Sequence, residues 1–296
     1  MKYIKILSLI VVAMALNSCI KEDMSDCPPV VSFTFSYNGD TNDPSMFAKY
    51  IDNVTLFCYD EAGELVKTHT VNKSDLALFQ GAKLSLYPGN YTIAAWGNIT
   101  EGTTEVIGNV LGTSRVRHPD FGKGTNIPGN DHLYYGRYNV SIPETKAEVA
   151  GDIPFKGAHI NVEVYVSGVG FANDQTSWAS VEMTSLMPEY TMMMDNAQPF
   201  ATTYYPVTTW SSEPNVSQSI FQTLRFEDDN EIEIKIKNQG GTLLASAMLK
   251  DFIKDNPIYS VNGKNEATVR IEFKFYDGKF EITIPDWGEQ PIEPNI

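Results

Sequence analysis

The clearest indication of the fold comes from residues 86–98, LYPGNYTIAAWGN. Pro88 and Gly89 are typical of a tight turn, because proline fixes φ and glycine tolerates a positive φ. Beyond the turn, successive side chains of a β-strand point to opposite faces of the sheet. One face then carries Tyr91, Ile93 and Ala95, and the other carries Thr92, Ala94 and Trp96. Because both faces are largely apolar, this segment is predicted to be a central strand of a β-sandwich.

The same period of two extends along the chain in both directions. Apolar and polar residues alternate, as in half-buried strands, over residues 31–37, 160–166 and 231–237. Residues 268–276 and 279–284 are predicted to form a hairpin, because Asp-Gly between them suits a two-residue turn. Short helices are expected only at 74–80, with Ser74 as its N-cap, and at 245–254. The pattern predicts an all-β chain of two β-sandwiches in series.

Polar segments indicate how the chain is divided. Residues 143–154 contain few apolar side chains and lie near the middle, so one sandwich is expected over 31–150 and another over 151–296. Residues 101–130 are rich in Gly, Thr and Pro and have no clear period. They are expected to form a long excursion on the surface.

The N-terminus has the features of a lipoprotein signal. Two lysines in the first five residues precede an uncharged apolar run, residues 6–16, which ends just before Cys19. The run is too short for a transmembrane helix, which needs about 20 residues. We therefore expect 1–18 to be a cleaved signal peptide and 19–30 to be a lipidated tether. Acyl chains such as palmitate on Cys19 would hold the protein on a membrane.

Charged residues follow the lipidation site directly. Lys21, Glu22 and Asp23 resemble the surface-export tag of lipoproteins in some Gram-negative anaerobes. The tag predicts display on the outer face of the outer membrane. An ordinary charged tether is the alternative reading.

Two further cysteines, Cys27 and Cys58, form an even pair in an oxidising compartment, where disulfides persist. Their spacing does not distinguish a disulfide between them from two free buried thiols.

The composition excludes some classes of function. The formal net charge of −15 repels nucleic acid, so nucleic-acid binding is not expected. No pair of histidines has metal-ligand spacing, and no nucleophile elbow or phosphate loop occurs. We therefore expect no catalytic residues, no metal and no cofactor. A glycosidase pair of carboxylates stays open, because such a pair is defined by its separation in space.

One group of aromatic residues has two readings. Exposed aromatic rings can stack on sugars, which would make the chain a surface glycan-binding lipoprotein. Packing in a core is the favoured reading, because large aromatic side chains are mostly buried. The residues in question are Trp178, Tyr204, Tyr205 and Trp210. Trp96 and Trp287 are both assigned to cores.

Four segments together resemble the FimB/Mfa-type anchor (minor) subunits of the type V fimbriae of Gram-negative anaerobes. They are the lipidated Cys19 followed by residues 22–28, EDMSDCP, then 54–63, VTLFCYDEAG, then 86–98, and finally 280–287, FEITIPDW. The family usually has an aliphatic residue at the position of Cys58.

The resemblance implies two transthyretin-like (Greek-key) β-sandwich domains, no enzymatic activity and a place at the base of a fimbrium on the outer membrane. It also implies fimbrial shaft or accessory subunits as partners, docked by β-strand addition. Shaft subunits of such systems lose their N-terminus to an arginine-specific protease, whereas the first arginine here is Arg115. Only nine residues follow Trp287, which leaves little chain to donate as a strand. Both features favour an anchor, and a tip subunit stays an alternative.

Overall fold

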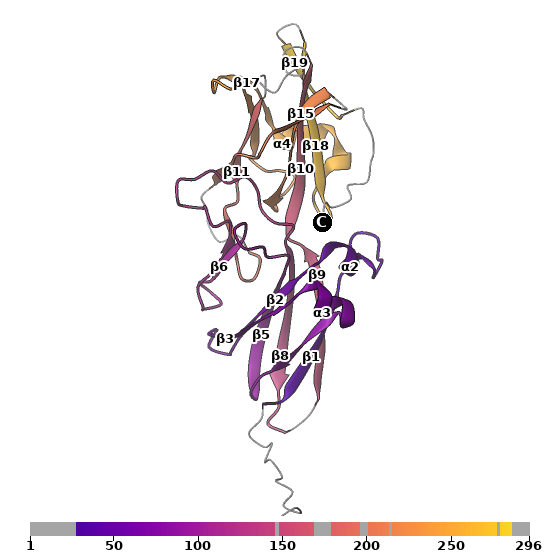
Figure 1. Ribbon diagram of the computed structural model, residues 1–296, viewed down its shortest axis with the longest axis vertical. Coiled ribbons are helices and arrows are strands. Elements are labelled where there is room, and N and C mark those ends of the chain that lie inside the picture. Colours follow the sequence, from indigo (N-terminus) through magenta and orange to yellow (C-terminus); the bar gives the residue numbers. More distant parts are fainter. Residues whose placement is uncertain are drawn as a thin grey trace, which may run out of the picture.

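The computed structural model describes residues 28–145, 148–168, 179–195, 201–212, 215–276 and 279–285. The molecule is elongated, with one β-sandwich at each end of its long axis (Figure 1). The prediction of an all-β chain of two sandwiches with few short helices is confirmed. None of the helices in these ranges is long and apolar enough to cross a membrane.

The first sandwich contains seven strands that the structure describes, in the order β3-β2-β5-β8-β9-β1-β4. They are β1 (Val30–Ser36), β2 (Val54–Tyr59), β3 (Leu65–Val71), β4 (Gly81–Ser85), β5 (Gly89–Gly97), β8 (Tyr134–Ile142) and β9 (Val149–Gly157). β9 joins the two layers, because residues 149–154 pair with β1 and residues 155–157 pair with β8. The predicted alternation holds in β1, where Val31, Phe33 and Phe35 face the core and the residues between them do not.

The second sandwich has a five-stranded sheet, β14-β15-β10-β18-β19, and a four-stranded sheet, β13-β11-β16-β17. Their bounds are β10 (His159–Gly168), β11 (Ser180–Leu186), β13 (Thr202–Tyr204), β14 (Thr209–Ser212), β15 (Asn215–Leu224), β16 (Glu233–Lys237), β17 (Leu243–Met248), β18 (Thr268–Tyr276) and β19 (Lys279–Thr283). Only Ala158 separates β9 from β10, so one nearly continuous run of strand passes from the first sandwich into the second. The predicted division between residues 150 and 151 lies inside β9.

A small third sheet connects the two sandwiches. It consists of β6 (Glu105–Ile107) and β7 (Arg115–Arg117) from the first half of the chain and β12 (Glu189–Thr191) from the second. The prediction that 101–130 is a surface excursion is therefore wrong in part: Val116 is completely buried. The reason is that β5 has a second apolar face, which must be buried. β7 and β12 cover it in a cluster that includes Trp96, Tyr135, Val116 and Tyr190.

The helices are short and differ in part from those expected. They are α2 (Met46–Tyr50), α3 (Lys73–Leu78), α4 (Leu249–Asp255) and the 3-10 turn η2 (Pro257–Tyr259). α3 is capped by Asn72, whose side chain accepts the backbone N–H of Asp75, and not by Ser74. The first part of the helix predicted at 245–254 is instead β17, because Ala245 and Ala247 alternate into the core.

Candidate functional site

The first strand of the chain is built into the middle of the first sandwich. β1 lies between β9, to which it is parallel, and β4, to which it is antiparallel. Its apolar side chains fill the core, and its polar side chains bind β9: Thr34 Oγ1 and Ser36 Oγ donate to the Asp152 carboxylate at 2.8 and 2.6 Å. The strand that follows the predicted tether thus completes this sandwich in cis.

One side of the second sandwich is only partly covered by the described residues. β11 contacts β15, and the four-stranded sheet has one strand fewer than the five-stranded sheet, in which β19 is the outer strand among the described residues. The exposures agree: Phe280 and Ile282 of β19 face the core side yet are 39% and 38% exposed, whereas their neighbour Phe273 in β18 is 0% exposed. We call the apolar side of β19, with Ile284 directly after it, the open flank.

A polar contact joins the two sandwiches near the far end of β1. The Asp40 carboxylate accepts the backbone N–H groups of Asn265 and Glu266 at 2.7 and 3.0 Å. The Glu266 carboxylate in turn accepts the hydroxyls of Tyr37 and Tyr134. Burial raises the pKa of Glu266, and the two tyrosine hydroxyls offset this in part. The contact fixes residues of the first sandwich to the loop before β18.

Two histidines lie beside this contact. His159, at the start of β10, is completely buried, and its Nδ1 lies 3.0 Å from the carbonyl oxygen of Leu133. The ring of His132 stands edge-on to it, with centroids 5.0 Å apart. Burial lowers the pKa of each histidine to about 4, so both are neutral at physiological pH.

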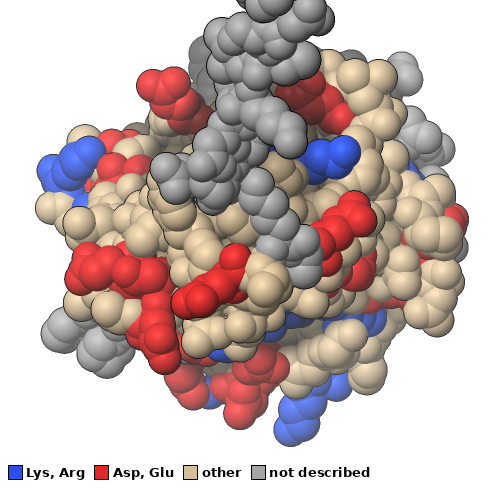
Figure 2. Space-filling model, turned by 90° about the horizontal axis from the view of Figure 1, so that it is seen from below, with Lys and Arg blue, Asp and Glu red and all other residues tan. Residues whose placement is uncertain are grey.

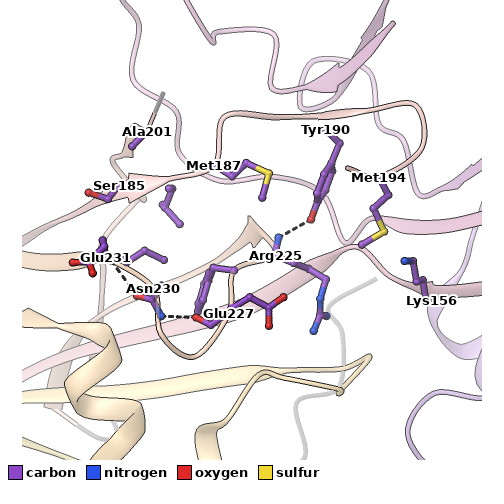
Figure 3. Close-up of a pocket in the computed structure, with 13 residues that line it drawn as sticks. Lys156, Ser185, Met187, Tyr190, Met194, Ala201, Arg225, Glu227, Asn230 and Glu231 are labelled. Atoms are coloured by element: carbon purple, nitrogen blue, oxygen red, sulfur yellow. Dashed lines mark hydrogen bonds between the residues drawn. The ribbon is translucent and has the colours of Figure 1, made fainter. Parts of the chain in front are cut away.

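A cavity of about 500 Å³ also lies in the second sandwich, beside Lys156 of β9 (Figure 3). Lys156, Tyr190, Arg225 and Glu227 line it. The Arg225 guanidinium is already occupied, because it donates to the backbone carbonyls of His159, Val261 and Lys264. Tyr190 Oη accepts the backbone N–H of Arg225 and donates to the Ala158 carbonyl. Arg225 and Tyr190 are thus bound to backbone groups of the second sandwich and of Ala158, at the junction with the first.

The residues predicted from the sequence as sites are mostly beyond the described ranges. Cys19, Lys21, Glu22, Asp23 and Cys27 lie there, so lipidation, export and a Cys27–Cys58 bond stay predictions. Cys58 itself is buried in β2, and burial raises the pKa of its thiol to about 12. The described residues contain no cluster of three or more side chains suited to a metal.

The aromatic group does not form one surface in the part of it that can be placed. Tyr204 belongs to the second core, whereas Tyr205 and Trp210 are 38% and 40% exposed. Trp178 and Trp287 lie outside the described residues. Charge is distributed as the composition suggests: Asp and Glu outnumber Lys and Arg on the face at the free end of the first sandwich (Figure 2).

Comparison with known proteins gives the family. Residues 24–293 match the model of the fimbrillin-A associated anchor proteins Mfa1 and Mfa2. The chain belongs to this fimbrial anchor family. The family consists of fimbrial structural proteins and is not an enzyme family. It implies a place at the cell surface and contact with other fimbrial subunits.

Solved structures share the fold of this anchor-family chain. A candidate polysaccharide-binding protein from Bacteroides thetaiotaomicron matches with a TM-score of 0.70 at 13% identity, covering 88% of this chain and 96% of that one. A candidate adhesin from the same organism has a TM-score of 0.66 at 19% identity, with 90% and 98% covered. The fimbrial anchor protein Mfa2 from Porphyromonas gingivalis has a TM-score of 0.60 at 18% identity, with 87% and 96% covered. No curated protein sequence matches the chain.

The contacts that join the two sandwiches could not be found from the sequence of this anchor-family member. Asp40 and Glu266 are 226 residues apart, and neither belongs to a motif. Asp152 lies in the polar segment 143–154, where the domain boundary was expected, and no local pattern indicates its two hydroxyl donors. The open flank can be predicted in part from the sequence, because Phe280, Ile282 and Ile284 stand at alternate positions in the last predicted strand.

Proposed function

We propose that this protein is an outer-membrane lipoprotein that anchors, or forms a minor subunit of, a type V fimbrium and docks a partner subunit by β-strand addition. Membership of the fimbrial anchor family supports a fimbrial role. The likeness in fold to a protein named as the fimbrial anchor of Porphyromonas gingivalis agrees with it. Lipid anchoring through Cys19 and display through Lys21, Glu22 and Asp23 complete the proposal.

The position of β1 is the observation that carries the proposal. A subunit in the middle of a strand-exchanged polymer must leave a groove for its neighbour's strand. In this chain the central position between β9 and β4 is already filled by its own β1. β1 begins eleven residues after Cys19, so the membrane-linked end of the chain is also a structural strand. This arrangement suits a subunit that stays attached and ends the polymer.

The open flank is then the proposed place for the partner. Edge strands present unpaired backbone groups that can pair with another chain, and pockets at alternate positions add specificity. β19 is the outer strand of its sheet among the described residues, and its core-facing apolar side chains are only partly covered. An added strand there would bury Phe280 and Ile282 more fully.

Loss of the protein tests this proposal. We expect a deletion strain to make fimbriae that are detached, abnormally long or shed into the medium. A missing shaft subunit would instead give no polymer, and a missing tip subunit would leave attached fimbriae that bind poorly. Electron microscopy of the cells and the medium separates these outcomes. Attached fimbriae of normal length would overturn the anchor proposal.

Membrane attachment is tested separately. We expect Cys19→Ala to release the protein from membranes, because the acyl chains supply the binding energy. We expect Lys21→Ala with Glu22→Ala and Asp23→Ala to leave a lipidated protein that protease added to intact cells does not reach. A Cys19→Ala protein that stays on salt-washed outer membranes, or equal proteolysis of the triple variant and wild type, would contradict these parts of the proposal.

A glycan-binding surface lipoprotein is the second candidate. The partial exposure of Tyr205 and Trp210 supports it, since both rings have some surface to offer a sugar. The similar fold from Bacteroides thetaiotaomicron that is described as a candidate polysaccharide-binding protein points the same way. Binding of the purified protein to a glycan array, lost in Tyr205→Ala and Trp210→Ala, would favour this candidate.

A further inference from the structure

The two sandwiches share one long axis of strand. β9 runs along the first sandwich, and after Ala158 β10 continues along the second, where it lies between β15 and β18 (Figure 1). β1 lies parallel to β9, with Val31 opposite Val149 and Ser36 opposite Pro154. We infer that β1 is a force-bearing strand, whose pairing with β9 and β4 resists sliding when the two ends of the molecule are pulled apart. This inference rests on the proposed function only in supposing that the protein is held at its N-terminus.

The direction of the load follows from the strand directions. β1 begins at the end of the first sandwich that lies away from the second sandwich (Figure 1). A pull on the tether therefore draws β1 back along its own axis, while a pull on the second sandwich draws β9 the opposite way. Parallel strands pulled in this sense slide along each other, so all their hydrogen bonds carry the load at once. Strands pulled apart sideways would lose their hydrogen bonds one pair at a time.

β1 is held by two ladders of backbone hydrogen bonds. Because it lies between two partners, sliding disrupts the parallel pairing with β9 and the antiparallel pairing with β4 together. Asp152 adds two side-chain hydrogen bonds across the β1–β9 boundary, from Thr34 and Ser36. Phe33 and Phe35 must leave a close-packed core, where Phe35 contacts the rings of Phe47 and Phe155.

The far end of β1 is held as well. Tyr37, directly after the strand, donates its hydroxyl to Glu266, and Asp40 accepts two backbone N–H groups from the second sandwich. The Asn265 side chain also donates to the Gly39 carbonyl at 3.2 Å. The far end of β1 is therefore hydrogen-bonded to the second sandwich, which is pulled in the opposite direction.

Single-molecule force spectroscopy on the lipid-free mature chain tests the inference by comparing two directions of pull. Both use a handle at the N-terminus and a second handle on an engineered cysteine, in a background with Cys19→Ser and Cys27→Ser. Lys156→Cys, at the far end of β9, loads β1 in sliding; Glu144→Cys, near the end where β1 begins, pulls it away sideways. Both positions are exposed and lie in the first sandwich. We expect a rupture force at least twofold higher with the Lys156→Cys handle, and equal forces in the two directions would overturn the inference.

Asp152→Asn gives a second readout. The amide cannot accept both hydroxyl hydrogen bonds as the carboxylate does. We expect the variant to lower the rupture force with the Lys156→Cys handle and to change it little with the Glu144→Cys handle. An equal effect in both directions would mean that Asp152 acts on general stability and would overturn its part in the clamp. These measurements use the isolated protein, so they can fail while the deletion strain still shows shed fimbriae, and the reverse.

Discussion

Trp96 of the first sandwich packs against Tyr190 of the second, with ring centroids 5.8 Å apart and planes inclined by 33°. Trp96 lies on the face of β5 that looks away from its own core, and Tyr190 comes from β12, which the chain reaches almost a hundred residues later. Tyr190 also binds Ala158 and Arg225 through its hydroxyl. This pair of rings therefore connects the outer face of one sandwich to the junction with the other.

Replacing Trp96 should destabilise the molecule strongly. Trp96 is completely buried, so we expect Trp96→Ala to lower the free energy of unfolding by about 3–5 kcal/mol through the cavity it leaves. Trp96→Phe should cost less, because it keeps a ring and removes an indole N–H that has no hydrogen-bond partner among the described residues. Urea titration measures both. Leu78→Ala, at an 89% exposed position, is the control and should change stability by no more than about 0.5 kcal/mol. A similar small change for Trp96→Ala would show that this junction is not part of the cooperative fold.

Stability should fall in mild acid because of His159. Its folded-state pKa of about 4 is below the ordinary value of 6.5, so the unfolded chain takes up a proton first as the pH falls. The stabilisation is thus present above pH 6.5 and is lost progressively toward pH 4, by on the order of 3 kcal/mol for a shift of this size. Unfolding free energies measured between pH 8 and about pH 4 test this. His159→Gln should reduce the slope whatever it does to stability at pH 8 and leave the part that comes from His132, whose pKa is lowered in the same way. An unchanged slope would exclude His159 as a source.

Weakening the open flank should reduce docking without unfolding the protein. Phe280→Ser with Ile282→Thr removes apolar surface that is partly exposed, so the cost in stability should be smaller than for a core residue. We expect at least tenfold less fimbrial subunit to copurify with this variant from outer membranes. Ile220→Thr is the matched control, because Ile220 is 51% exposed on the opposite face of the same sheet. Equal recovery with both variants would move the docking site away from β19.

The thiol of Cys58 should be unreactive in the folded protein. The thiolate is the reactive form, and burial raises the pKa of this thiol to about 12. We therefore expect no alkylation of Cys58 by iodoacetamide at about pH 8 until the chain is unfolded. Unfolding without a reductant then distinguishes the two states left open by the sequence, because a thiol bonded to Cys27 would need reduction first. Rapid labelling of the native protein would contradict the buried position.

The sequence predicted the strands whose side chains alternate and missed what depends on distant partners. β1, β5 and β10 follow directly from their patterns of apolar residues. β17 was mistaken for a helix because its alanines favour helices, and only pairing with β16 makes it a strand. β7 has a single buried apolar residue, Val116, between two arginines, so no local signal marks it as a cover for Trp96.

The sequence likewise predicts only part of the candidate site. The alternating Phe280, Ile282 and Ile284 were visible in the sequence, but their partial exposure depends on one sheet having fewer strands than the other. Asp40 and Asp152 are polar residues without a motif, and each finds its partners more than a hundred residues away. Such contacts follow from the topology of the whole chain and have no local pattern.

The pairing of β1 with β9 also sets an order of events during synthesis. Thr34 and Asp152 are 118 residues apart, so β1 is synthesised long before its parallel partner. β4 follows sooner, but the first sandwich stays unfinished until residue 154 has passed, and pairing across so long a loop is slow. During this interval Val31, Phe33 and Phe35 form an uncovered, aggregation-prone segment. In pulsed hydrogen exchange we therefore expect the amides of β1 to be the last in this sandwich to gain protection.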